Sequence, residues 1–404
     1  MATQYPEVEG ELVDCEQYCA TLCGHIKCGS SVEQIRRCSN EFIDFLNSQS
    51  RLNFKYLIDK ESPAVFEVFT AIEVCTEDVA ILALCKCLER FLDVPNNAVK
   101  LRRIRRLCQA NATHHLIKTL IYLLNSTVVV NRTELIDSLV IVLLSLAKKD
   151  KKFSLKVRLT GLLRILANQI ATDLVGKSSA LLALLAYCAR TARNATFLAK
   201  QQNVLEHVLN TLQNTRTPAD VLEFYCELLF FVSRTKNCRP RLLAYDAVRI
   251  VLSLIKWSLE RRQDRTWLAI CEISVGCLRQ LARSKNGREQ IISLDGLVFC
   301  EQAIKTLSGE ASVAEGVSDT STLQSAFCAV CLACLPCRPY PLHNAPLPLF
   351  FKLPTQSGSP TKNTSTNGAS SGDSSESEDE EDKLDIFGDE PETENLSEAS
   401  LVVL

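Results

Sequence analysis

The stretch ARSKNGREQIISLDGLVFCEQAIKTL, from Ala282 to Leu307, contains the pattern that decides the fold. A helix is expected to end at residues 283–285, and the Asn286-Gly287 pair, typical of turns, is expected to reverse the chain. A short amphipathic helix follows, and Gly296 is expected to direct the chain into a longer helix. The stretch therefore predicts a unit of short and long helices joined by tight turns.

The same pattern recurs twice upstream, in SRTKNCRPRLLAYDAVRIVLSLI from Ser233 and ARTARNATFLAKQQNVLEHVLNTL from Ala189. Equivalent places are assigned to Asn194, Asn237 and Asn286, which gives spacings of 43 and 49 residues. A further step of 43 residues back from Asn194 reaches Lys151, in another basic turn. Helical repeats of about 40 to 47 residues are typical of armadillo and HEAT proteins, whose units bury their apolar faces against their neighbours. The predicted fold class is an all-α, armadillo/HEAT-like α-solenoid with a disordered acidic C-terminal tail.

Composition supports helices and indicates the cellular compartment. Hydrophobic residues make up 47% of the chain and aromatic residues only 6%, without the alternation that strands show. The polar start ATQYPEVEGE resembles no signal segment, so the 19 cysteines are expected to be free thiols in the reducing cytosol. The longest apolar run, near 135–147, is too short to span a bilayer, so no membrane association is predicted.

Four segments are expected along the chain. They are a cysteine-rich helical cap at 1–60, armadillo-like repeats at 61–335, a proline-rich extended segment at 336–354 and a disordered Ser-rich acidic tail at 355–404. The tail carries 13 acidic and 2 basic side chains, which leaves 43 basic and 34 acidic side chains in the rest. A basic body is expected to attract an anionic partner or the tail of the same chain.

One motif superficially suggests nucleotide binding. Residues 171–178, ATDLVGKS, fit a relaxed phosphate-loop pattern. A phosphate loop follows a buried strand, whereas an amphipathic helix is predicted here over Leu155–Gln169. The pattern therefore favours a loop between helices in which Ser178 is the N-cap, and Lys177 is not expected to bind a nucleotide.

A second motif superficially suggests a metal. The CxxCxxCxxC run of Cys328, Cys331, Cys334 and Cys337 has the spacing of some cluster ligands. The residues between these cysteines continue an apolar helix, however, and do not form a loop that could wrap a metal. Packed core cysteines are therefore predicted. No histidine lies in an HExxH frame and no GxSxG occurs, so the sequence nominates no catalytic, cofactor-binding or metal-binding residue.

Two cationic clusters are the candidate sites for an anionic partner. The first consists of Lys100, Arg102, Arg103, Arg105 and Arg106, and the second of Lys148, Lys149, Lys151, Lys152, Lys156 and Arg158. The alternative, a solvated helix face without a partner, stays open at this point. The lack of interleaved aromatic residues argues against single-stranded nucleic acid. Candidate phosphorylation sites in the acidic tail are Ser374, Ser375 and Ser377.

The segment AKKDKKFSLKVRLTGLLRILANQ, which begins at Ala147, resembles the N-terminal armadillo-like region of cytosolic carboxypeptidases. The likeness extends more weakly over about 130–395. In that family a zinc carboxypeptidase domain follows and removes glutamates from tubulin tails and other acidic C-termini. The zinc domain's histidine–glutamate motif has no match here, so zinc is expected only in the absent domain and the chain is expected to be a fragment or a truncated product.

The resemblance implies a non-catalytic module that binds or positions tubulin or other acidic polypeptides, in the cytosol or on microtubules. The first alternative is a stand-alone armadillo adaptor for an unrelated acidic or extended peptide. A second alternative, of another class, is an enzyme that uses Lys177 or the cysteines from Cys328 to Cys337. Bound nucleotide or metal in the purified protein would favour that enzyme.

Overall fold

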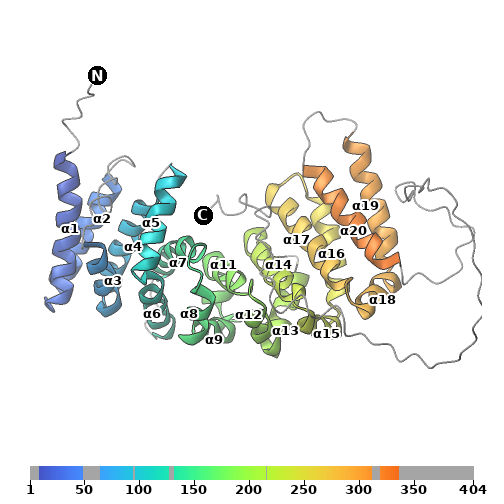
Figure 1. The fold of residues 1–404 in the computed structure, drawn as a ribbon, viewed down its shortest axis with the longest axis horizontal. Coiled ribbons are helices and arrows are strands. Elements are labelled where there is room, and N and C mark those ends of the chain that lie inside the picture. Colours follow the sequence, from blue (N-terminus) through green and yellow to red (C-terminus); the bar gives the residue numbers. More distant parts are fainter. Residues whose placement is uncertain are drawn as a thin grey trace, which may run out of the picture. The chain divides into compact units, whose positions relative to one another are not determined.

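The computed structural model describes residues 9–48, 64–93, 96–126, 132–214, 216–311 and 319–335 (Figure 1). Within these ranges the chain forms twenty α-helices and a short 3-10 helix, and no strand is found. The proline-rich segment 336–354 and the acidic tail 355–404 that the sequence predicts lie outside the described residues. The helices are α1 (Glu9–Lys27), α2 (Val32–Ser48), α3 (Ala64–Val74), α4 (Asp78–Leu92), α5 (Asn97–Gln109), α6 (Ala112–Asn125), α7 (Thr133–Ala147), α8 (Phe153–Leu159), α9 (Leu162–Gln169), α10 (Asp173–Gly176), α11 (Ser179–Cys188), α12 (Ala192–Lys200), α13 (Gln202–Gln213), α14 (Ala219–Arg234), η2 (Lys236–Cys238), α15 (Arg239–Ala244), α16 (Ala247–Glu260), α17 (Arg265–Leu281), α18 (Lys285–Ser293), α19 (Gly296–Ala311) and α20 (Asp319–Cys334).

The long helices pack in two rows. In one row α1, α3, α6, α9, α13 and α16 each contact the next member. In the other row, called row B below, α2, α4, α7, α11, α14, α17 and α20 do the same. Short helices such as α8, α12, α15 and α18 follow row B helices and lead into the next pair (Figure 1). Each unit thus buries apolar surface against the units before and after it, which confirms the predicted all-α solenoid.

The core lies between the two rows and is mainly aliphatic, with buried cysteines and a few aromatic rings such as Phe42 and Tyr225 among the aliphatic side chains. Helix α7, which contains the longest apolar run of the sequence, packs against α4, α5, α6 and α11. Its side chains from Leu135 to Ala147 are largely buried, with Leu139, Val140 and Leu143 completely enclosed. Most cysteines of the described residues, including Cys188, are buried free thiols. Their small apolar side chains fill space between closely packed helices.

Four residues in left-handed conformation direct the chain from one helix of a repeat into the next. They are Asn111, Gly161, Asp246 and Asp295, with φ of 58°, 83°, 58° and 54°. Glycine, asparagine and aspartate tolerate this region best. The single helix predicted over 155–169 is therefore wrong: Gly161 ends one helix and begins another. At the last such turn, where Gly296 is expected to redirect the chain, Asp295 takes the left-handed conformation and Gly296 begins α19.

The Asn286-Gly287 pair does not form the predicted turn but lies inside α18. The helix begins after Ser284, whose Oγ accepts a hydrogen bond from the Gly287 N–H at 3.2 Å. The corresponding N-cap positions upstream are Thr191 and Thr235, so the structural spacings are 44 and 49 residues. Asn286 is the second residue after its cap, whereas Asn194 is the third. The asparagines are therefore not all equivalent, although the repeat they pointed to is real.

Candidate anion-binding surface

Helix α5 presents the first cationic cluster on its outward side. The helix begins at Asn96, whose Oδ1 accepts hydrogen bonds from the N–H groups of Ala98 and Val99 at 2.9 and 3.4 Å. Its inward side buries Ile104 and Leu107. The cluster residues on the other side are exposed or half-buried, namely Lys100, Arg102, Arg105 and Arg106.

Arg103 does not belong to this surface, which corrects the sequence-based assignment. Its side chain is only 1% exposed and its Nη1 donates to the carbonyl oxygen of Phe91 at 2.6 Å. The guanidinium also lies 4.4 Å from the centre of the Phe91 ring. Arg103 therefore caps the C-terminal end of α4 from inside the protein, because unpaired carbonyls at a helix end need donors.

The second cluster lies in the turn between α7 and α8. Lys148, Lys149, Lys151 and Lys152 are all exposed there. Asp150 holds the turn, because its carboxylate accepts hydrogen bonds from the Lys152 N–H at 2.9 Å, from Thr113 Oγ1 on α6 and from Lys156 Nζ at 2.7 Å.

This arrangement divides the predicted cluster by role. Lys156 forms an ion pair with Asp150 and is mostly covered, so it stabilises the turn, while Arg158 is half-buried on α8. Burial opposes ionisation of Asp150, but the hydrogen bonds from Lys156, Thr113 and the Lys152 backbone outweigh it and lower the pKa of that carboxyl group. The four lysines before α8 remain as the solvent-facing cations of this cluster.

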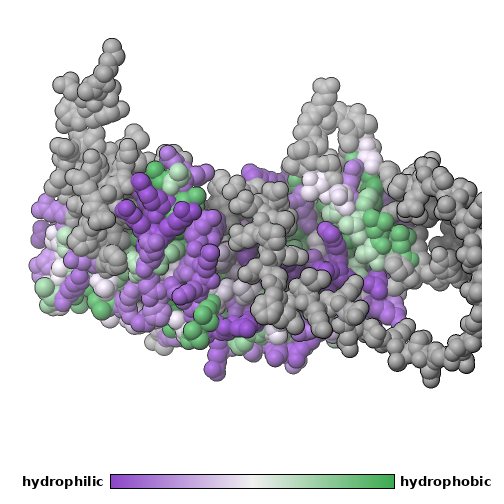
Figure 2. All heavy atoms as spheres, viewed as in Figure 1, coloured by the Kyte–Doolittle hydropathy of each residue, from purple (hydrophilic) through white to green (hydrophobic). Residues whose placement is uncertain are grey.

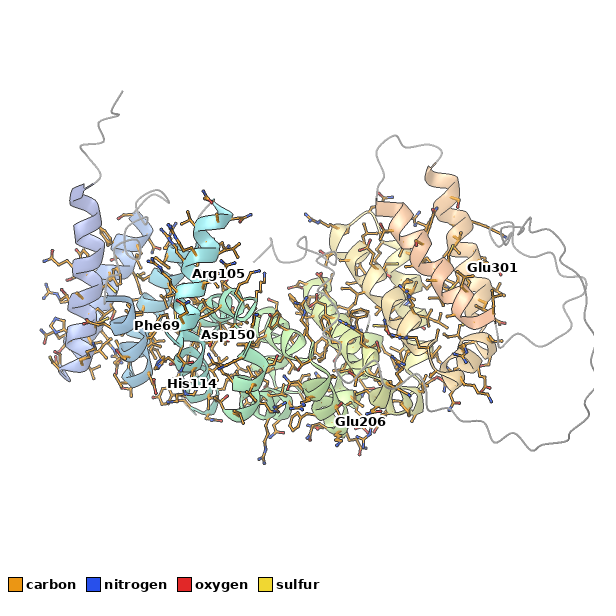
Figure 3. The ribbon with its side chains drawn as sticks, in the orientation of Figure 1. Phe69, Arg105, His114, Asp150, Glu206 and Glu301 are labelled. Carbon is orange, nitrogen blue, oxygen red and sulfur yellow. The ribbon has the colours of Figure 1, made fainter. Side chains whose placement is uncertain are left out.

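The fold brings the two clusters to the same edge. Helix α5 packs on α7, and the Cys108 thiol near the end of α5 donates to the carbonyl oxygen of Leu146 near the end of α7 at 3.6 Å. Hydrophilic side chains gather over the region of α5 and α7 (Figure 2). Figure 3 shows Arg105 on α5 and Asp150 after α7 on neighbouring elements. Cations about 45 residues apart in sequence, such as Arg105 and Lys149, thus belong to one surface.

The phosphate-loop reading is contradicted by the structure. Residues 171–178 connect α9, α10 and α11, with no strand before them. Ser178 Oγ accepts from the Leu181 N–H at 3.2 Å and so caps α11, as the sequence predicts. Lys177 forms an exposed ion pair with Asp173 at 2.9 Å. The loop has a structural role in joining helices.

The cysteine run lies on helix α20, as predicted, and Cys337 falls outside the described residues. Cys331 and Cys334 are buried, while Cys328 is half-buried. The hydrogen bond with the Cys331 thiol, together with burial, raises the pKa of Cys300 on the neighbouring helix α19. Metal ligation requires thiolates, so this environment disfavours it. Across the described ranges, no group of three or more His, Cys, Asp or Glu side chains is placed to hold a metal ion.

No helix in the described part of the chain combines the length and the apolar character that a membrane span needs.

Solved structures with similar helical arrangements are distant in sequence. The crystal structure of an engineered protein matches with a TM-score of 0.54 and 14% identity, covering 76% of this chain and 67% of that one. A second engineered protein gives a TM-score of 0.48 at 13% identity and covers 67% of this chain and 96% of the other. A designed armadillo repeat protein gives 0.47 at 15% identity, with 67% and 99% covered. At these identities the first match shows the fold alone.

Family comparison is more specific. No curated protein matches the sequence. A family model described as "CCP1-like, N-terminal TPR repeats" matches residues 21–311, which include both cationic clusters. Repeats of 44 and 49 residues with a short helix before each long pair differ from the two-helix TPR unit of about 34 residues and fit the armadillo arrangement. The chain belongs to this CCP1-like family and corresponds to the N-terminal repeat region of cytosolic carboxypeptidase-like proteins.

Proposed function

We propose that this non-catalytic repeat module binds an acidic polypeptide through the exposed cations of α5 and the α7–α8 turn, and so positions it for a partner or a linked enzyme. The observation that carries the proposal is the convergence of two sequence-distant clusters on one edge. Within that edge the described carboxylate closest to the lysines, Asp150, is already engaged by Lys156. The surface therefore has a positive charge that an acidic partner would complement.

The affinity is expected to come from many weak contacts. An exposed ion pair contributes up to about 1 kcal/mol and is weakened by salt. A single acidic side chain would bind too weakly to be retained, whereas a run of acidic residues can contact several cations together. The family resemblance supports glutamate-rich C-terminal tails, such as those of tubulin, as the partner class.

Neutralising three exposed cations tests the proposal. We expect the triple variant Arg105→Gln, Lys149→Gln, Lys151→Gln to bind a glutamate-rich peptide about 10- to 100-fold more weakly, because each lost contact costs up to about 1 kcal/mol. The measurement is fluorescence anisotropy with a labelled peptide at low salt.

A matched control removes three exposed cations elsewhere. The variant Arg216→Gln, Lys256→Gln, Lys305→Gln changes the net charge equally, with side chains on the α13–α14 connection, α16 and α19. Its affinity is expected to fall less than about threefold, through long-range charge alone. Equal losses in the two variants would mean that net charge and not this surface attracts the peptide, and the proposal would be wrong.

A further inference from the structure

A basic turn follows each of four consecutive row B helices. The turns after α7, α11, α14 and α17 have the sequences KKDKK (148–152), ARTAR (189–193), RTKNCRPR (234–241) and RSKNGRE (283–289). The last three ranges include the first residues of the short helices that follow, and the third also includes Arg234 at the end of α14. Together they contain thirteen basic and two acidic side chains. This excess of basic over acidic side chains recurs in each of the four repeats and extends beyond the two clusters described above.

Hydrogen bonds between neighbouring units hold these turns side by side. At the ends of the row B helices, Tyr187 Oη donates to the carbonyl oxygen of Ala147 at 2.9 Å. At the short helices, Arg241 Nη1 donates to the Ala199 carbonyl at 3.0 Å. One unit further on, a Gln290 Nε2 to Leu243 carbonyl hydrogen bond of 3.3 Å links α18 to α15. The four turns therefore follow one another along a single edge of the repeats.

Most of the cations on this edge face solvent. Arg193, Lys236 and Lys285, one from each turn beyond the α7–α8 turn, are exposed. Arg239 is the exception, because it is buried and its Nε donates to the Ser233 carbonyl at 3.0 Å. Of the two acids, Asp150 is paired with Lys156, and Glu289 lies at the far end of the last turn.

We propose that these four turns form a continuous basic rim that binds one extended acidic polypeptide across four repeats. The proposal rests on the proposed function and adds the length and path of the ligand. Packed helices lie about 8 to 10 Å apart, and an extended chain advances about 3.3 Å per residue. One acidic side chain in every three residues can therefore meet successive turns, and a segment of about 10 to 15 residues spans the rim.

The rim is suited to carboxylates more than to single-stranded nucleic acid. None of the four turn sequences contains an aromatic residue on which bases could stack. Of the aromatic side chains beside the turns, Phe153 is buried, and Tyr187 has its hydroxyl bonded to the Ala147 carbonyl and the Arg190 guanidinium 5.0 Å from its ring centre. The rim thus offers regularly spaced positive charges and no stacking surface, which suits an acidic polypeptide.

The test uses the full chain and labelled peptides of five and fifteen glutamates at low salt. The rim variant is Arg193→Gln, Lys236→Gln, Lys285→Gln, and the control is the Arg216, Lys256, Lys305 variant defined above. We expect the rim variant to bind the fifteen-residue peptide about tenfold more weakly and the five-residue peptide less than threefold more weakly. The control variant is expected to change both by less than threefold. Circular dichroism checks that each variant is folded.

The possible failures are distinguishable. If the rim variant binds the long peptide as well as the unmodified chain does, while the Arg105, Lys149, Lys151 variant is weakened, the rim is wrong and the proposed function stands. If the unmodified chain binds neither peptide, the proposed function fails. A fifteen-nucleotide single strand that binds more tightly than the long peptide, with the same loss in the rim variant, would overturn the assignment of the rim to a polypeptide.

Discussion

Replacing Gly287 by alanine is expected to lower the free energy of unfolding by about 3 kcal/mol, because the added methyl group has no space. A Cβ at this position would lie 2.0 Å from the carbonyl oxygen and 2.8 Å from the carbonyl carbon of Leu281. Both atoms are backbone at the end of α17, so relief requires α17 and α18 to move apart. The measurement is denaturant-induced unfolding followed by circular dichroism.

Gly24→Ala is the matched control for this substitution. Gly24 also lies in a helix, and no heavy atom of a neighbouring residue would come within 4 Å of its new Cβ. Alanine is expected to stabilise that helix by up to about 1 kcal/mol, because it restricts the unfolded chain. Opposite signs at the two glycines would support the close approach of α18 to α17. A Gly287→Ala protein as stable as the unmodified chain would contradict it.

The same place in an earlier repeat is filled differently. Asn194, the third residue of α12, is completely buried and its Nδ2 donates to the Cys188 carbonyl at 2.9 Å. Both Asn194 and Gly287 thus meet the carbonyl six residues earlier, at the end of a row B helix. Asn194 meets its carbonyl with an amide donor, whereas Gly287 leaves room for its carbonyl because it has no side chain. The two repeats therefore share the geometry of this turn but not the residue.

Arg103→Ala is the second substitution with a large expected effect on stability. It would remove the donor to the Phe91 carbonyl and leave a cavity where the guanidinium packs on the Phe91 ring. We expect a loss of about 3 kcal/mol, from the unsatisfied carbonyl and the lost packing together. Thermal or denaturant unfolding measures it.

Arg105→Ala, two residues further along the same helix, provides the comparison. Arg105 is exposed, so its removal is expected to change stability by less than about 0.5 kcal/mol. Its expected effect is on the affinity for acidic peptide. If Arg105→Ala destabilised the protein as much as Arg103→Ala, the division of the α5 cations into one structural and several surface residues would be wrong.

The fold could be predicted from the sequence because each repeat contains apolar residues at helical spacing and a recurring basic turn. It could not predict every boundary. Of the four left-handed residues that join consecutive helices, only Gly161 is a glycine, and the apolar pattern on either side of it favours one continuous helix. Asn111, Asp246 and Asp295 adopt the same conformation, which their residue types permit but do not require.

The candidate site could be predicted in part. The two clusters were visible as runs of charge, but the fate of each cation depends on neighbours that are distant in sequence. Arg103 lies one turn before Leu107 on the inward face of α5, and this spacing was the available signal that it would be buried. In the sequence, the rim residues Arg193 and Lys285 each lie in what looks like an ordinary polar turn. Only the stacking of the repeats places these turns along one edge.

The central claim is that the exposed basic surface binds acidic polypeptide. Its most direct measurement is cosedimentation of the full chain with microtubules whose tubulin tails carry glutamates, compared with microtubules whose tails have been trimmed, at low and moderate salt. Binding is expected to require the tails and to fall as salt rises, because screening weakens exposed charge contacts. Equal binding to the two kinds of microtubule, or binding to neither, would contradict it.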